Sequence, residues 1–247
     1  MCASFKKINK EKYYYGVNLG ILNYVTSGNK ILDVGCGAGL MGKEIKNKKN
    51  YVYGIDNSKV QLKIASKMLD AVKHVDIRDD DLNLPNDFDI MVFVDILEHL
   101  EDPLSCLKKF KKYLKKDGKI IVSIPNIACY NSRINLLLGK FNYANYGVLD
   151  NTHLRFFTKK TAKQLIGGAG YKIIKLDTTP YFAFQIFNFY KKLFLTEKGD
   201  NSLIYEVFES KTYQFYRHYI FPIENLIVKL WPGLLAYQFI IVGEKET

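Results

Sequence analysis

The chain has 247 residues, which is enough for one large α/β domain with an elaborated segment and too long for a small scaffold stabilised by disulfides. Its four cysteines lack the spacing of a metal site or a disulfide framework. The first residues lack the apolar core of a secretion signal, and no apolar run reaches the roughly 18 residues of a transmembrane helix, so we expect a cytoplasmic protein. The net charge of +11 comes mainly from lysines spread along the chain, which favours a solvated surface or attraction to an anionic membrane over nucleic-acid binding.

Short apolar runs alternate with helical periodicity along most of the chain. Asp102 followed by Pro103 is typical of a helix start, because the first residue can cap the helix and proline suits its first position. This order predicts an α/β protein with a doubly wound, Rossmann-like and mostly parallel sheet. We predict helices at 39–48, 58–70, 103–115 and 159–168, and strands at 30–35, 51–55, 72–76, 88–94, 118–124, 171–176 and 235–242.

The most informative stretch is ILDVGCGAG at 31–39, which leads from an apolar strand into a glycine-rich turn. Gly35, Gly37 and Gly39 let the backbone turn sharply and let a ligand approach where a Cβ atom would collide. The next strand ends at Asp56, where a carboxylate can accept hydrogen bonds from both hydroxyls of a ribose. The sequence therefore predicts a nucleotide-like ligand at the tips of the first two strands.

Two cofactors compete for this turn. Gly37, Gly39 and Gly42 also spell the G-x-G-x-x-G pattern of dinucleotide-binding proteins, which would indicate a nicotinamide-dependent dehydrogenase. Asp33 argues against this, because a carboxylate would repel a pyrophosphate but can hold, directly or through water, the ammonium of an amino-acid moiety. Together with VYGIDNS at 52–58, the turn resembles the cofactor half of class I S-adenosylmethionine-dependent methyltransferases.

The resemblance implies which residues hold S-adenosyl-L-methionine. It makes Asp76 a partner for the adenine amino group and Ile77 a wall against the ring. It also implies a seven-stranded sheet whose last strand is antiparallel and lies at the edge. The predicted cofactor-binding residues are Asp33, Gly35, Cys36, Gly37, Gly39, Asp56, Asn57, Asp76, Ile77 and Asp95.

The fourth predicted strand opens the segment FDIMVFVDILEHLEDP at 88–103, which resembles ubiquinone-biosynthesis and sugar-modifying methyltransferases. One helical turn would place Asp95, Glu98 and His99 on one face beside the reactive methyl group. His99 would then be a general base that Glu98 orients. Alternatively, the trio would bind a divalent ion with His153 completing the site, as the resembling segment does in some methyltransferases, or the turn would only cap backbone groups. We take the base role, without a metal, as the prediction.

A third segment, DNTHLRFFT at 150–158, resembles methyltransferases that act on cell-surface polysaccharides and other glycosyl groups. His153 would be a second base, and Arg155 would either anchor a carboxylate or phosphate of the acceptor or pair with an acid of the core. The predicted catalytic residues are therefore His99, His153 and Glu98.

We interpret the chain as a single methyltransferase domain, residues 1–247, with two insertions on the acceptor side at 126–157 and 178–234. The second insertion is rich in aromatic residues and lysines, which suits a lid, a packing layer or peripheral contact with an anionic membrane. The core of the domain comprises 12–125, 158–177 and 235–245.

These patterns predict an S-adenosylmethionine-dependent methyltransferase that methylates an oxygen of a small or glycan-linked acceptor. Three alternatives are a non-catalytic cofactor-binding protein, an RNA methyltransferase and a nicotinamide-dependent dehydrogenase. They would be distinguished by absent turnover, by RNA binding with steep salt dependence, and by binding of nicotinamide nucleotides.

Overall fold

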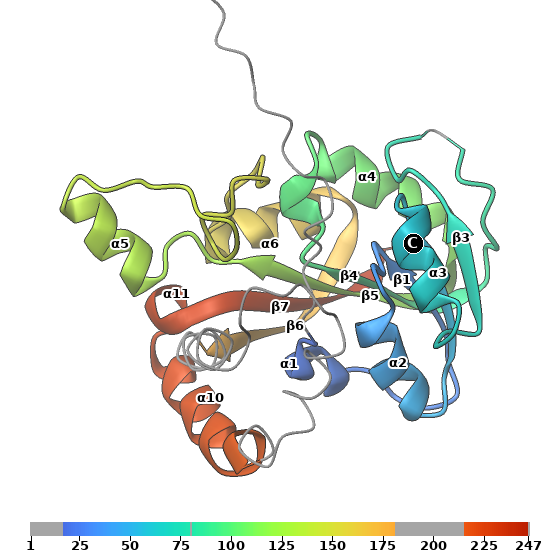
Figure 1. The fold of residues 1–247 in the computed structure, drawn as a ribbon, viewed down its shortest axis with the longest axis horizontal. Coiled ribbons are helices and arrows are strands. Elements are labelled where there is room, and N and C mark those ends of the chain that lie inside the picture. The colour runs from blue at the N-terminus through green and yellow to red at the C-terminus, as the bar shows by residue number, and fades with distance from the viewer. Residues whose placement is uncertain (1–16, 80, 181–214, 247) are drawn as a thin grey trace, which may run out of the picture.

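The computed structural model describes residues 17–79, 81–180 and 215–246. Its seven strands form one sheet in the order β3-β2-β1-β4-β5-β7-β6 (Figure 1). Strands β1 to β5 are parallel to one another, and β7 runs antiparallel between β5 and β6. The carboxyl ends of the five parallel strands therefore meet at one edge of the sheet. The strands are β1 Lys30–Val34, β2 Tyr51–Asp56, β3 Ala71–His74, β4 Phe88–Val94, β5 Leu114–Pro125, β6 Tyr171–Pro180 and β7 Ala236–Lys245.

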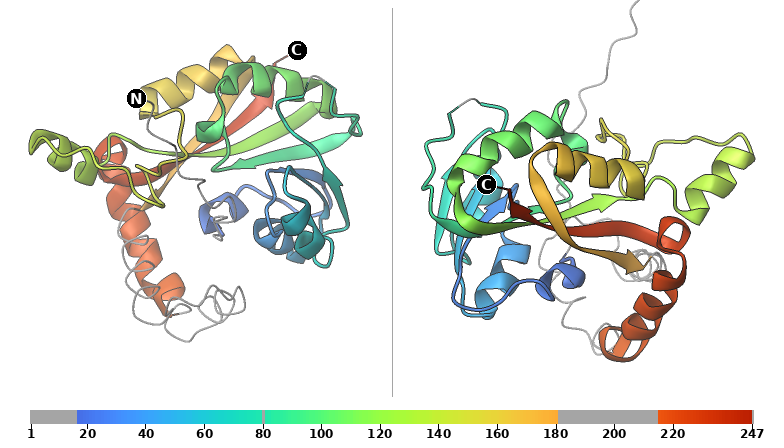
Figure 2. Two further views of the ribbon diagram at one scale, coloured as in Figure 1. Left: turned by 45° about the horizontal axis from the view of Figure 1, so that its top comes forward. Right: turned by 180° about the vertical axis from the view of Figure 1, so that it is seen from behind.

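Helices cover both faces of this sheet (Figure 2). Successive residues of a strand point to opposite faces, so Ile31 packs with α1, α2 and α3, whereas Leu32 packs with α4 and α6. These helices are α1 Leu19–Leu22, α2 Leu40–Asn47, α3 Lys59–Ala65, α4 Pro103–Phe110 and α6 Lys159–Gly168. Two 3-10 turns, η1 Leu97–His99 and η2 Lys111–Tyr113, follow β4 and α4.

Local sequence signals explain where the helices begin. The Ser58 hydroxyl accepts a hydrogen bond from the third residue of α3, and the Asp102 carboxylate does the same for α4. Thr158 and Thr161 form a capping box at the start of α6. The seven predicted strands and four predicted helices are present, and α6 has the predicted bounds.

Two expectations about the elements were wrong. The last strand does not lie at the sheet edge, because β7 is buried along most of its length and pairs on both sides, while β6 carries exposed lysines that suit an edge position. Helix α3 ends at Ala65 instead of residue 70, because the chain then turns and places Leu69 in the core.

Two long segments leave the sheet. The first, between β5 and α6, contains α5 Tyr130–Leu137. The second begins after Pro180, not at residue 178, because β6 is longer than predicted. Its described part contains a π-helical turn η3 Tyr216–Ile220, α10 Phe221–Leu230 and α11 Pro232–Leu235. Residues 181–214, which carry most of the aromatic residues of this insertion, lie outside the described residues. Among the described helices, none combines the length and apolar character needed to cross a membrane.

Candidate cofactor and acceptor site

The turn after β1 has a backbone that favours glycine at three positions. Gly35, Gly37 and Gly39 have φ angles of 71°, 51° and 83°, which lie in the left-handed region. A Cβ atom on Gly35 would lie 2.8 Å from Cδ1 of Ile96, and one on Gly39 would lie 3.1 Å from Cα of Ala65. The glycines therefore allow both the turn itself and its close packing against Ile96 after β4 and against α3.

The end of β2 fixes the shape of this turn. The backbone amide of Cys36 donates to the carbonyl of Ile55 at 2.9 Å, and the amide of Gly37 donates to Oδ2 of Asp56 at 2.9 Å. The other carboxylate oxygen of Asp56 accepts from the amide of Ser58 at 2.8 Å. Since each carboxylate oxygen can accept more than one hydrogen bond, Asp56 can shape the turn and still accept from a ribose. Asn57, the next predicted residue, is exposed beside it.

Asp33 lies buried beneath the turn at the end of β1. Burial, with the nearby Asp56 carboxylate as a second cause, raises the pKa of Asp33 to about 7, and the amide of Gly42 partly offsets this. Among the described residues, Oδ2 of Asp33 has no hydrogen-bond partner. A buried, unpaired carboxylate oxygen lowers its free energy when a cation or hydrogen-bond donor arrives, so Asp33 fits the ammonium end of the predicted cofactor.

The tip of β3 brings Asp76 and Ile77 to the same edge. Ile77 is buried, and Asp76 forms an ion pair with Arg78 at 2.5 Å. The hydrogen bond from Arg78 is the main reason that the pKa of Asp76 falls to about 2. A partner for an adenine amino group must accept hydrogen bonds, and an ionised Asp76 meets that requirement while Arg78 orients it.

Asp95 follows β4 with a φ of 51°, and its carboxylate points into a polar network. The Ser123 hydroxyl donates to Oδ1 at 2.7 Å, and the Gln238 amide donates to Oδ2 at 2.7 Å. The amide of Asn18 in turn donates to Oε1 of Gln238 at 3.0 Å. The prediction that Asp95, Glu98 and His99 share one helical face was therefore wrong. The positive φ at Asp95 ends regular structure before the 3-10 turn, and its side chain faces β5 and β7.

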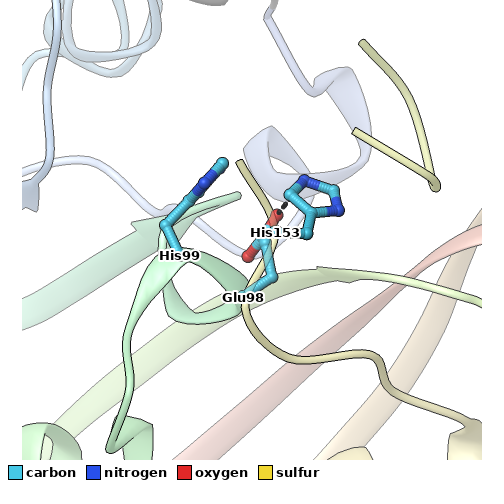
Figure 3. Close-up of side chains that lie close together, drawn as sticks. All are labelled: Glu98, His99 and His153. Carbon is cyan, nitrogen blue, oxygen red and sulfur yellow. Dashed lines mark ion pairs between the residues drawn. The ribbon is translucent and has the colours of Figure 1, made fainter. Parts of the chain in front are cut away.

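Glu98, His99 and His153 form a cluster instead (Figure 3). Oε1 of Glu98 lies 3.9 Å from Nε2 of His153, and the two imidazole rings pack edge to face with centroids 4.8 Å apart. One potential metal-ligating atom from each of the three side chains lies within 4.8 Å of the others. The cluster thus joins the turn after β4 to the segment that precedes α6.

Backbone contacts hold both imidazoles. Nδ1 of His153 lies 3.2 Å from the carbonyl of Val148, and Nδ1 of His99 lies 3.2 Å from the carbonyl of Thr152. Donation from Nδ1 to a carbonyl leaves Nε2 with a free lone pair, which is the form that accepts a proton or binds a metal. The sequence prediction that Glu98 orients His99 was wrong, because these carbonyl contacts orient the rings and Glu98 faces His153.

Burial shifts the titration of this cluster. Desolvation, reinforced by His99, lowers the pKa of His153 to about 4, so its ring is neutral at pH 7. Desolvation, reinforced by Asp95, raises the pKa of Glu98 well above its usual value. Neither carboxyl oxygen of Glu98 has a hydrogen-bond partner among the described residues. A proton on the carboxyl group, a bound ion or a polar acceptor group would each relieve this cost.

The main chain of Glu98 tethers the other segment. Its carbonyl accepts from the amides of Leu154 and Arg155 at 2.8 and 3.0 Å, which places His153 over the carboxyl group. The guanidinium of Arg155 donates to the carbonyl of Glu101 at 3.0 Å through Nε. Of the two alternatives for Arg155, pairing with a core acid is therefore not observed in the described part of the chain, since its guanidinium donates to a main-chain carbonyl of the turn, and the role as an acceptor anchor stays a prediction.

Sequence reasoning missed three members of the site. Ser123 and Gln238 donate to Asp95, and Asn18 donates to Gln238. These three residues come from β5, β7 and the position before α1, so no local pattern joins them to Asp95. Thr152, which contacts His99, was within a recognised segment, so its hydroxyl could have been noted.

Comparisons with known proteins identify the family of the chain. Residues 16–176 match a family described as "Methyltransferase domain". The ubiquinone biosynthesis O-methyltransferase of Idiomarina loihiensis is 33% identical over 119 residues, which are 44% of this chain and 49% of that protein. This chain thus spans about half the length of the curated relatives it matches.

Solved structures share the fold. A SAM dependent methyltransferase from Archaeoglobus fulgidus superposes with a TM-score of 0.57 at 20% identity, covering 92% of this chain and 90% of that one. The phosphoethanolamine N-methyltransferase 2 of Haemonchus contortus, solved in complex with S-adenosyl-L-methionine, gives a TM-score of 0.55 at 16% identity and covers 93% and 52% of the two chains.

Proposed function

The chain belongs to the methyltransferase-domain family, whose cofactor is S-adenosylmethionine, and we propose that it transfers the cofactor's methyl group to an oxygen of a small or glycan-linked acceptor. The observation that carries this proposal is the pairing of two sites at one sheet edge. A glycine turn with Asp33 and Asp56 lies at the tips of β1 and β2, and the cluster of the buried Glu98 with His99 and His153 joins the turn after β4 to the segment before α6.

The cofactor supplies an electrophilic methyl group when it is bound, so the protein mainly has to hold the two reactants in line. Asp56 would accept from the ribose, Asp33 would balance the ammonium, and Ile77 would pack against the adenine. These assignments follow from the polarity and burial of each side chain.

The cluster supplies the proton chemistry. An acceptor hydroxyl becomes more nucleophilic as its proton is removed, and a neutral imidazole with a free Nε2 can take that proton. His99 is partly exposed and its Nδ1 is directed at Thr152, which suits a base that meets the acceptor. His153 and Glu98 would line the site beside His99 and keep the acceptor hydroxyl in place.

The acceptor class rests on similarity and on the site together. Relatives are named for ubiquinone biosynthesis and O-methylation, and a phenolic or sugar hydroxyl is the kind of group that an uncharged histidine can deprotonate. We place the enzyme in the cytoplasm, with a glycan-linked acceptor reached at the inner face of the membrane.

The decisive experiment combines binding and turnover. Calorimetry with S-adenosylmethionine and its demethylated product should show micromolar-range binding, and transfer of a labelled methyl group should be screened over dihydroxyphenols, sugar nucleotides, lipid-linked glycans and RNA. Methylation of RNA alone would overturn the acceptor class. Binding of NAD without any response to S-adenosylmethionine would overturn the cofactor, and cofactor binding without methylation of any acceptor would favour a non-catalytic protein.

A metal-assisted reaction is a second candidate, because Glu98, His99 and His153 offer ligand atoms close to one another. A cation there would polarise the acceptor oxygen and compensate the unpaired Glu98 carboxyl group. Activity abolished by a chelator and restored by magnesium or zinc, together with loss of Mn²⁺ binding in Glu98→Gln, would favour this mechanism. Full activity in excess chelator would favour the base.

A further inference from the structure

The segment between β5 and the cluster has an unusual charge pattern. Residues 127–149 contain no Asp or Glu, and their two charged side chains are Arg133 and Lys140. The chain as a whole carries a net charge of +11. A stretch that lacks carboxylates throughout and carries two cations is complementary to an anionic surface.

The same segment exposes apolar side chains. Helix α5 stands at one end of the molecule, away from the sheet (Figure 1, Figure 2). Leu137 is 86% exposed and Leu138 is 61% exposed, at the end of the helix. We call the following set the α5 surface: Ile134, Leu137, Leu138, Phe141, Tyr143 and Tyr146, all exposed. Within α5, Ser132 is the buried residue, so the helix does not use its leucines to pack on its own domain.

A row of aromatic contacts connects this surface with the cluster. Phe141 lies between Tyr143 and Phe156, with ring centroids 5.5 and 6.2 Å away. Phe156 is 6.3 Å from the ring of His153, which packs against His99. The α5 surface is therefore the rim of the proposed acceptor site and not a remote patch.

We propose that the α5 surface docks on an anionic phospholipid bilayer and presents the cluster to an acceptor held in that bilayer. The inference rests on the proposed function and deepens it, because it names the source of the acceptor. Leucines would enter the acyl boundary, tyrosines would lie at the headgroup level, and Arg133 and Lys140 would contact the lipid phosphates.

Helix α10, with Trp231 after it, is the rival surface, since its exposed apolar residues are Ile223, Leu226, Ile227, Leu230 and Trp231. It differs in two respects. Helix α10 packs against β6, the edge strand, and no ring contact among the described residues links it to His153 or His99. The α5 surface is thus the better placed of the two to bring a membrane-borne hydroxyl to the cluster.

Flotation of the full chain with vesicles tests the proposal. Vesicles of phosphatidylcholine and phosphatidylglycerol should carry the protein at low salt, and vesicles of phosphatidylcholine alone should carry much less. The double variant Leu137→Asp/Leu138→Asp should reduce binding at least roughly tenfold. The matched variant Leu226→Asp/Leu230→Asp should float like the parent. Loss of flotation in the α10 variant alone, or no flotation of the parent, would overturn the proposal.

Two controls separate the outcomes. Calorimetry with the demethylated cofactor on the same samples reports the proposed function, so a variant that loses vesicle binding but keeps cofactor binding is folded and fails only in docking. Light scattering reports self-association. A parent dimer that the Leu137→Asp/Leu138→Asp variant abolishes, with no vesicle binding by either, would assign the surface to a protein contact and overturn the membrane role.

Discussion

Glu98 and His153 face each other with Oε1 and Nε2 3.9 Å apart, and both side chains are almost fully buried. An imidazolium there would gain little from a carboxyl group whose own pKa is raised, because both groups pay for desolvation. Burial therefore disfavours the charged form of both groups, and this gives two opposite contributions to the pH dependence of stability.

The first contribution belongs to His153. The unfolded imidazole binds a proton below about pH 6.5 and the folded one only below about 4, so the free energy of unfolding falls as the pH falls through this window. The full difference corresponds to roughly 3 kcal/mol. His153→Gln should remove this part of the pH dependence in urea titrations, and His218→Gln, at an exposed position, should retain it. Parallel curves for parent and His153→Gln would contradict the prediction.

The second contribution belongs to Glu98. Its folded pKa is raised, so any stability linked to the protonated carboxyl group is present at low pH and is lost as the pH rises through that value. Glu98→Gln, which keeps the shape but cannot ionise, should raise the free energy of unfolding above neutral pH by roughly 1–3 kcal/mol and lower methyl transfer. Glu101→Gln, an exposed neighbour, should change neither. Thermal unfolding at acidic and alkaline pH measures the difference.

A third prediction concerns cofactor affinity. Asp56→Ala should weaken binding of S-adenosylmethionine and of its product by roughly 1–3 kcal/mol, because the ribose loses a charged acceptor and the Gly37 amide loses its partner. Asp87→Ala removes an exposed carboxylate that pairs with Lys30 and should leave the affinity unchanged. Calorimetry measures both affinities, and equal values for Asp56→Ala and the parent would show that Asp56 does not bind the cofactor.

A fourth prediction separates chemistry from binding. His99→Ala and His153→Ala should leave cofactor affinity nearly unchanged and lower turnover, by about a hundredfold for His99→Ala, the usual contribution of a general base, and at least about tenfold for His153→Ala, because the acceptor hydroxyl is then less well held. The exposed His218→Ala serves as the matched control. If neither histidine variant lowers turnover tenfold, both residues are structural or peripheral.

A fifth prediction compares two glycines with nearly the same backbone angle. Gly28 has a φ of 81° and Gly39 a φ of 83°, but a Cβ on Gly28 would meet nothing within 4 Å, whereas one on Gly39 would lie 3.1 Å from both Cα and Cβ of Ala65. Gly28→Ala should cost about 1 kcal/mol for strain alone. Gly39→Ala should cost roughly 1–3 kcal/mol more and should also weaken cofactor binding. Equal denaturation midpoints for the two variants would contradict the prediction and show that α3 moves to accommodate the added methyl group.

The local pattern of the sequence was sufficient for the elements and for the family. The apolar period of 30–35, the cap before Pro103 and the bounds of 159–168 depend on neighbours a few positions away, so they were predicted with little error. The glycine turn and Asp56 were also recognisable, because a turn between a strand and a helix has a local chemical signature. The family match then confirmed the methyltransferase identification.

Contacts between distant segments were decided only by the tertiary structure. His153 meets Glu98 because two backbone amides of its own segment bond to the Glu98 carbonyl, and no local pattern specifies that pairing. The carboxylate of Asp95 accepts from Ser123 and Gln238, and Gln238 is 143 positions away in the sequence. β7 lies inside the sheet because its apolar residues are buried between two neighbours. Hydrophobic periodicity determines which face of an element is buried, whereas strand order and side-chain partners depend on how complete elements pack.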